Sequence, residues 1–205
     1  MVKIQTKPHI LLVTAGFLMV VFMWGIGIVA TAAQFFYPPP YSFTPVQVGL
    51  FYLAPTIGAV LAELWGRFFL NWSANWYIRK HRGVFNIEQR LWGCYPALIT
   101  SIVGLVMFGQ TFQHELHWAV AAVGWLIYVV GQVSVTVAIS AYCLDCSPKH
   151  STIVASLISF WRTTGGFCVG YFQLKWVEHN GAGASFGTQA GILTASFATI
   201  VLVQI

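Results

Sequence analysis

The chain has 205 residues, of which 58% are hydrophobic and 7% are charged. Soluble domains carry roughly a quarter charged residues, so the charges here are too few to cover a water-facing surface, and we expect the outer surface to face lipid. The formal net charge of +5 comes from ten basic and five acidic residues; because the acids are scarce rather than the bases abundant, it does not indicate a nucleic-acid partner.

Six long apolar stretches follow one another along the chain. A helix needs about 20 mostly apolar residues to cross a bilayer, and none of the stretches alternates as a membrane-spanning strand would. The sequence therefore predicts an all-α, polytopic membrane protein with one six-helix bundle over residues 1–205. The predicted spans are Ile10–Phe36, Val46–Phe69, Leu91–Phe112, Trp118–Leu144, Ile153–Trp176 and Phe186–Ile205.

The first span has an alternative interpretation. A short basic segment precedes it, and Ala30-Thr31-Ala32 resembles a signal-peptidase site. The apolar run is about 24 residues long, which exceeds the apolar region of a signal peptide and suits a membrane span. We therefore interpret it as the first transmembrane helix.

The basic residues lie almost entirely on one side of the predicted bundle. Because cytoplasmic loops are enriched in lysine and arginine, this side is predicted to be cytoplasmic, with both termini inside. We expect a multi-pass protein of the plasma membrane. The other side receives Lys175 alone, and the basic side receives Lys3, Lys7, Arg67, Arg79, Lys80, Arg82, Arg90 and Lys149.

The longest predicted connector, Leu70–Arg90, is a cytoplasmic loop. Its first half is rich in tryptophan and tyrosine and ends in the basic cluster Arg79–Arg82, a pattern typical of an amphipathic stretch at the membrane interface. Two interpretations stay open. The connector either anchors the topology or forms part of a gate.

Three ordered stretches resemble the C-terminal half of a fungal major facilitator superfamily (MFS) transporter, in the branch of drug, polyamine and small-cation antiporters. Residues 41–50 (YSFTPVQVGL) enter the second span, residues 83–91 (GVFNIEQRL) are similar to a loop motif, and residues 141–146 (AYCLDC) are similar to the end of helix ten. The resemblance implies that the six spans correspond to helices seven to twelve.

The resemblance also implies a function. Such transporters have twelve helices in two halves and move a solute by alternating access along a path between them. The implied substrate is a small organic solute such as a cationic drug, a polyamine or a nicotinate-like compound, and the implied coupling ion is the proton. We expect the chain to lie in a lipid bilayer and to need no cofactor. The missing half would be a separate six-helix chain or a second copy in a homodimer.

Two competing classes stay open. The abrupt start before helix seven favours a non-transporting truncated remnant or gene-model fragment, which transcript sequencing would reveal. A membrane enzyme is the other class, but the sequence has no phosphate loop, nucleophile elbow or dinucleotide fingerprint, so we expect no enzyme. Cys143 and Cys146 with His150 lack a fourth ligand, so we expect no metal.

Ionisable groups within spans are costly and usually functional. Arg162 lies near the middle of the fifth span, where it either lines the substrate cavity or bonds to backbone carbonyls. Glu63 and Arg67 share one helix face at i,i+4 spacing, so they are either a local pair or part of a proton-responsive latch. From the resemblance, we expect the inner gate to comprise Glu63, Arg67, Glu88, Arg90 and Asp145.

Uncharged side chains complete the candidate substrate site. Gln132 and Tyr128 lie in the fourth span, which corresponds to the cavity-lining helix ten; the alternative is interhelical hydrogen bonding. Trp24 and Trp161 could stack on a cationic substrate, although tryptophans in spans more often pack against lipid or other helices.

Overall fold

The computed structural model describes residues 8–80 and 87–204 of the chain. Across these ranges the chain is helical and forms no strand, so the all-α prediction is confirmed. In chain order the elements are α2 (Pro8–Leu11), the π-helical η1 (Leu12–Leu18), α3 (Met19–Phe36), α4 (Pro45–Phe51), α5 (Leu53–Lys80), the 3-10 helix η2 (Ile87–Gly93), α6 (Cys94–Gln113), α7 (Trp118–Cys146), the 3-10 helix η3 (Pro148–His150), α8 (Ser151–Asn180), α9 (Ala182–Ser196) and α10 (Ala198–Gln204).

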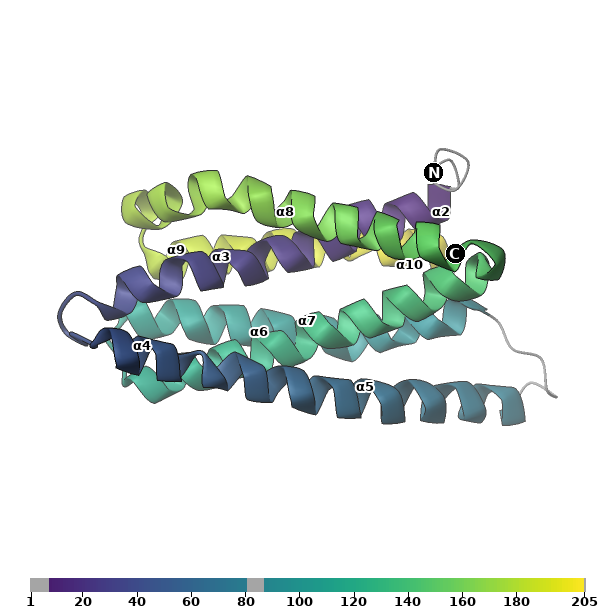
Figure 1. Cartoon of the computed structure of the whole chain (residues 1–205), viewed down its shortest axis with the longest axis horizontal. Coiled ribbons are helices and arrows are strands. Elements are labelled where there is room, and N and C mark those ends of the chain that lie inside the picture. The colour runs from purple at the N-terminus through teal and green to yellow at the C-terminus, as the bar shows by residue number, and fades with distance from the viewer. Residues whose placement is uncertain (1–7, 81–86, 205) are drawn as a thin grey trace.

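Within the described residues, the helices group into six rods that run side by side along the long axis of the molecule (Figure 1). Elements α2, η1 and α3 continue one another as the first rod, α4 and α5 form the second, and η2 and α6 form the third. Helices α7 and α8 are the fourth and fifth, and α9 with α10 is the sixth. Helix α2 and the end of α10 lie at the same end of the bundle (Figure 1).

Five of the rods are long and apolar enough to cross a membrane, counting the described residues alone. They coincide with five of the six predicted spans. Helix α8 covers the remaining predicted span and packs along α3, but it carries polar residues such as Arg162 and Gln173 and is not among the rods that qualify. Its membrane crossing therefore stays a prediction. The five rods that qualify are His9–Phe36, Pro45–Phe69, Ile87–Gln113, Trp118–Cys146 and Ala182–Gln204.

Helix α5 is longer than the sequence predicted. The predicted span ends at Phe69, as does the apolar part of the rod, and α5 continues beyond it to Lys80. Residues 71–80 contain no proline or glycine, so nothing in the local sequence ends the helix there. The first half of the predicted loop is therefore a continuation of the second rod. Residues 81–86, including Arg82 of the basic cluster, lie outside the described residues.

The turn between the first two rods is fixed by a capping box. The Thr44 backbone N–H donates to the Gln47 side chain at 2.8 Å, and the Thr44 hydroxyl accepts from the Gln47 N–H. Pro45 occupies the first turn, where its missing N–H is tolerated. Phe43 stacks on Phe36 at 5.1 Å between ring centroids. This turn starts α4 and so positions Tyr52, which lies at the cavity described below.

Helices α6 and α7 approach each other closely at Gly104. A Cβ atom on this residue would lie 2.5 Å from the backbone nitrogen of Tyr128 and 2.7 Å from the carbonyl oxygen of Gly124. Small residues permit such close packing between membrane helices. This contact makes α6 and α7 a tight pair at the centre of the bundle.

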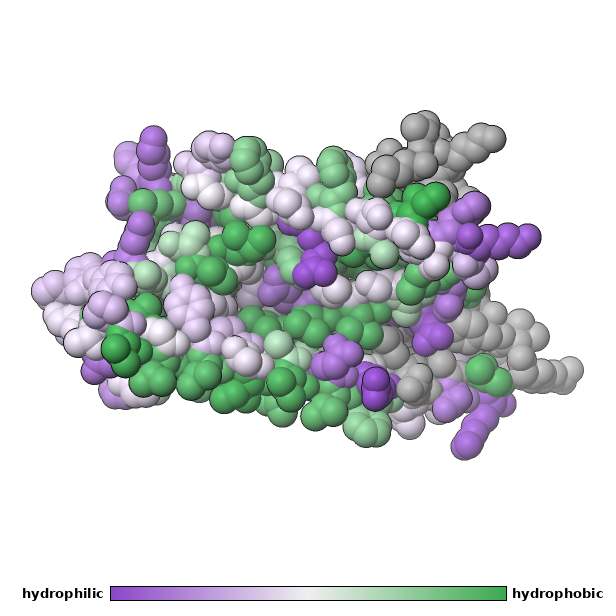
Figure 2. Space-filling view, in the orientation of Figure 1, coloured by the Kyte–Doolittle hydropathy of each residue, from purple (hydrophilic) through white to green (hydrophobic). Residues whose placement is uncertain are grey.

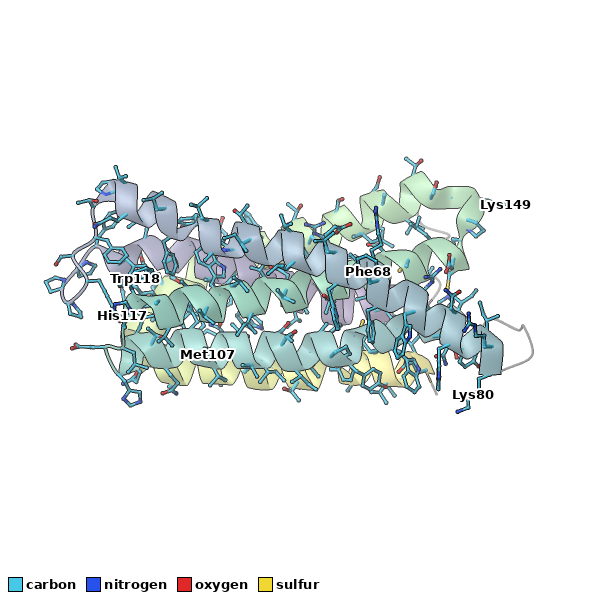
Figure 3. All side chains as sticks on the ribbon, turned by 90° about the horizontal axis from the view of Figure 1, so that it is seen from below. Phe68, Lys80, Met107, His117, Trp118 and Lys149 are labelled. Carbon is cyan, nitrogen blue, oxygen red and sulfur yellow. The ribbon has the colours of Figure 1, made fainter. Side chains whose placement is uncertain are left out.

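The surface is apolar along the bundle and polar at its ends. Apolar residues dominate the face of α5 in Figure 2, and α5 exposes Ile57, Val60, Leu64 and Phe68. Lys80 and Lys149 lie at one end of the bundle, and His117 and Trp118 lie at the other (Figure 3). The apolar band with polar ends matches the surface that a bilayer requires.

Candidate functional site

A cavity of about 610 Å³ opens between four rods at mid-length of the bundle. Figure 2 shows hydrophilic atoms in the middle of this face, between α8 and α5, with apolar surface on both sides. A hydrophilic patch at the depth of the bilayer core must be covered by water, a ligand or another protein surface. The lining residues come from α3 (Phe22, Gly25, Ile26, Val29), the second rod (Tyr52, Pro55, Thr56), α7 (Trp125, Val129, Gln132) and α8 (Ser159, Arg162, Thr163).

Arg162 carries the formal charge of this cavity. Its guanidinium lies over the Phe22 ring, with 3.9 Å from Cζ to the ring centroid. Within the described residues Arg162 forms no ion pair, and no side-chain hydrogen bond is recorded for it. A cation–π contact orients the planar group but leaves its N–H donors unused. The cavity therefore holds a positioned cation with free hydrogen-bond donors.

Gln132 faces Arg162's cavity from α7 and packs against α3. The end of the Gln132 side chain lies directly against Gly25, where a Cβ atom would meet the amide group. At the mouth, the Tyr52 hydroxyl donates to the Val29 carbonyl at 2.9 Å. These contacts join α3, α7 and the second rod around one space.

The structure brings Arg162 and Gln132 together but places three predicted site residues elsewhere. Tyr128 is fully buried, and its hydroxyl donates to the Val21 carbonyl. Trp24 is 1% exposed and packs on the Phe172 and Trp176 rings, which hold it between α3 and α8.

Trp161 is half-buried beside Phe160 and does not line the cavity. The aromatic residues that line the cavity are instead Phe22, Tyr52 and Trp125. The i, i+4, i+7 spacing of Trp125, Val129 and Gln132 marks one face of α7, and this spacing is the signal that could have identified Trp125 from the sequence.

The predicted gate residues divide into two groups. Arg90 in η2 donates from Nε to Asp145 Oδ2 at 3.0 Å, so the end of α7 is tied to the start of the third rod. Glu88 lies two residues before Arg90, in the same 3-10 helix. Glu63 and Arg67 are exposed on α5, and in the part of the chain that the structure describes they form no ion pair with each other.

Sequence reasoning missed a buried amide pair. Gln189 donates from Nε2 to Gln173 Oε1 at 2.9 Å, and both side chains are at most 1% exposed. The pair joins α8 to α9 away from the cavity, and an amide hydrogen bond between helices stabilises their contact in a membrane.

Comparisons with known proteins give a consistent result. Quinidine resistance protein 3 of Saccharomyces cerevisiae is 20% identical over 167 residues, which cover 81% of this chain and 24% of the relative. MFS antiporter QDR3 of Candida albicans is 26% identical over 77% of this chain and 22% of its own length. MFS-type transporter pyvG of Aspergillus violaceofuscus is 37% identical over 54% of this chain and 20% of its own length.

The chain is thus a relative of fungal MFS transporters, which confirms the resemblance seen in the ordered motifs. It spans about a quarter of the length of the curated relatives it matches. No family model matches the chain, and no solved structure matches it significantly. The relatives are named as transporters and antiporters, which are not enzymes, in agreement with the expectation from the sequence.

Proposed function

We propose that this relative of fungal MFS transporters moves a small organic solute across a membrane by alternating access. In this proposal the six rods correspond to helices seven to twelve, and the cavity between α3, α5, α7 and α8 is their half of the substrate path. A second six-helix half, from another chain or a second copy, covers the open side. Transport in general is supported by the names of the relatives.

The observation that carries the proposal is the position of Arg162. It follows Ser151, the first residue of α8, by 11 residues, which is about 17 Å along a helix. A charged side chain at the bilayer centre costs about 2.5–3.5 kcal/mol on insertion scales. The open cavity relieves this cost if water or a facing protein half fills it, and both are properties of a transport path.

The orientation and the gate are part of the same proposal. The end that carries Lys80 and Lys149 is cytoplasmic in it, by the bias of basic residues towards the inside, and the membrane is the plasma membrane. The Arg90–Asp145 ion pair closes the inner end, with Glu88 beside it and with Glu63 and Arg67 contributed from α5. Glu63, which is exposed on α5, is the proposed proton-responsive group.

Uptake into proteoliposomes tests the proposal. The full chain is reconstituted at a protein-to-lipid ratio that lets two copies meet, a pH gradient is imposed, and quinidine and benzoate serve as probe solutes. We expect uptake above that of protein-free liposomes and its loss in Arg162→Ala. Lys175→Ala, which removes an exposed cation from the same helix, should retain uptake.

Two results would count against parts of the proposal. If neither probe enters above background while the protein is incorporated and helical, the chain does not transport these solutes. If Glu63→Gln transports with unchanged pH dependence, Glu63 is not the proton-responsive group, and the coupling would have to lie in another residue.

A further inference from the structure

The charge of the cavity is not balanced by any acidic residue near it in the described chain. The lining contains Arg162 and no aspartate or glutamate. Of the acidic residues in the described ranges, Asp145 pairs with Arg90, and Glu115 and Glu178 line a separate cavity at the opposite end of the bundle from Lys80. Because Arg162 is the charged side chain of the lining and no carboxylate lies beside it there, the cavity is expected to attract anions and repel cations.

The two remaining glutamates, Glu63 and Glu88, do not change this conclusion. Glu88 belongs to η2, at the basic end of the bundle. Glu63 is exposed on α5, seven residues after Thr56, which is about 10 Å along the helix from the cavity wall. Neither residue lines the cavity.

The hydroxyl groups beside Arg162 are also available to a ligand. Ser156 and Thr164 on α8 donate their hydroxyls to carbonyls of the preceding turn. Ser159 and Thr163 flank Arg162 on the cavity side, and among the described residues no such bond is recorded for either. Their hydroxyls can therefore bond to a ligand that Arg162 binds.

The remaining wall fits an apolar ligand body. Phe22 lies beneath the guanidinium, and Trp125, Ile26 and Val129 complete the lining. Small-molecule sites of this size combine an apolar wall with a few polar groups that fix orientation. A guanidinium with unused N–H donors matches the two oxygens of a carboxylate.

We propose that the cavity binds organic anions, specifically a carboxylate on a compact aromatic or apolar body, with Arg162 as the anchor and Ser159, Thr163 and Gln132 as additional hydrogen-bond partners. This inference rests on the proposed function in taking the cavity as a solute site. Among the solutes that the resemblance implied, it favours the nicotinate-like class over cationic drugs and polyamines.

Equilibrium binding of three ring compounds that differ in charge tests the inference. The full chain in lipid nanodiscs is titrated with radiolabelled benzoate, benzamide and benzylammonium. We expect saturable binding of benzoate, binding of benzamide at least tenfold weaker, and no saturable binding of benzylammonium. Arg162→Gln should weaken benzoate binding at least tenfold, and Arg162→Lys should retain part of it because the charge remains.

The control is Lys175→Gln, which makes the same change of charge at an exposed position of α8; it should bind benzoate as the wild type does. Circular dichroism establishes that each variant is helical. If Arg162→Gln does not fold, Arg162→Lys and the comparison of the three probes still test whether the cavity prefers an anion. Benzylammonium binding as tight as benzoate, unchanged benzoate binding in Arg162→Gln, or no benzoate binding at all would overturn the inference.

The binding and uptake results separate the two proposals. Arg162-dependent benzoate binding without uptake would contradict transport and support the anion site. Uptake of quinidine without benzoate binding would support transport and contradict the anion site.

Discussion

Replacing Gly104 with alanine tests the packing at the centre of the bundle. The new Cβ atom would lie 2.5 Å from the Tyr128 nitrogen, and ordinary van der Waals contact begins at 3.4 Å. The difference of about 0.9 Å cannot be absorbed by rotating a side chain, because the neighbouring atoms are backbone. Helices α6 and α7 must therefore separate locally.

The size of the effect follows from two opposing contributions. Forcing an extra methyl group into a packed core costs about 1–3 kcal/mol. Alanine in place of a helical glycine recovers about 0.5–1 kcal/mol through the lower entropy of the unfolded chain. We expect Gly104→Ala to lower the free energy of unfolding by on the order of 1–2 kcal/mol. Gly191→Ala in α9, where a Cβ atom would meet nothing within 4 Å, should be neutral or slightly stabilised.

The assay is reversible unfolding of the purified chain in mixed micelles, with increasing sodium dodecyl sulfate and helicity followed by circular dichroism. The two variants make the same chemical change, so the sign of their difference reports the helix contact alone. Equal stability of Gly104→Ala and Gly191→Ala would refute the close approach of α6 and α7.

Three further outcomes follow from particular contacts. Gln189→Leu should lose about 0.6–1.7 kcal/mol because Gln173 is left buried without its partner, and adding Gln173→Leu should recover part of the loss in the same unfolding assay. Arg90→Gln should lower the free energy of unfolding by under about 1 kcal/mol, because the ion pair of Arg90 with Asp145 is partly exposed. The double variant Arg90→Asp with Asp145→Arg, which exchanges the two charges, should recover part of that loss. Burial raises the pKa of Tyr41, whose hydroxyl donates to a loop carbonyl. The unfolded chain therefore ionises first, so the free energy of unfolding should fall as pH rises above about 10, and should fall less in Tyr41→Phe when measured from pH 8 to 11.

The sequence was sufficient for the helical fold because apolar length depends only on local composition. Arg162 and Gln132, which the sequence singled out as polar groups in mid-span, line one cavity, and their role in binding stays a prediction. It did not identify Phe22, because an aromatic residue in an apolar helix looks the same whether it faces lipid, the core or a guanidinium.

Trp24 and Tyr128 do not line this cavity, and the sequence could not show that for a related reason. Trp24 and Tyr128 have side chains suited to a binding site, but the rotation of each helix about its axis decides which way they face. That rotation is set by contacts between rods, such as the one at Gly104, and these depend on pairs of residues far apart in the chain. Helix α5 runs past the predicted span to Lys80 because no residue between Phe69 and Lys80 interrupts it.

The unbroken course of α5 has a mechanical consequence. Lys80 follows Thr56, which lines the cavity, by 24 positions in α5, or about 36 Å at the usual rise per residue. If a rigid helix of that length tilted by about 5° about Thr56, its end at Lys80 would move by about 3 Å. A spectroscopic label placed at Lys80 would therefore magnify small rearrangements around the cavity into a displacement that distance measurements can resolve.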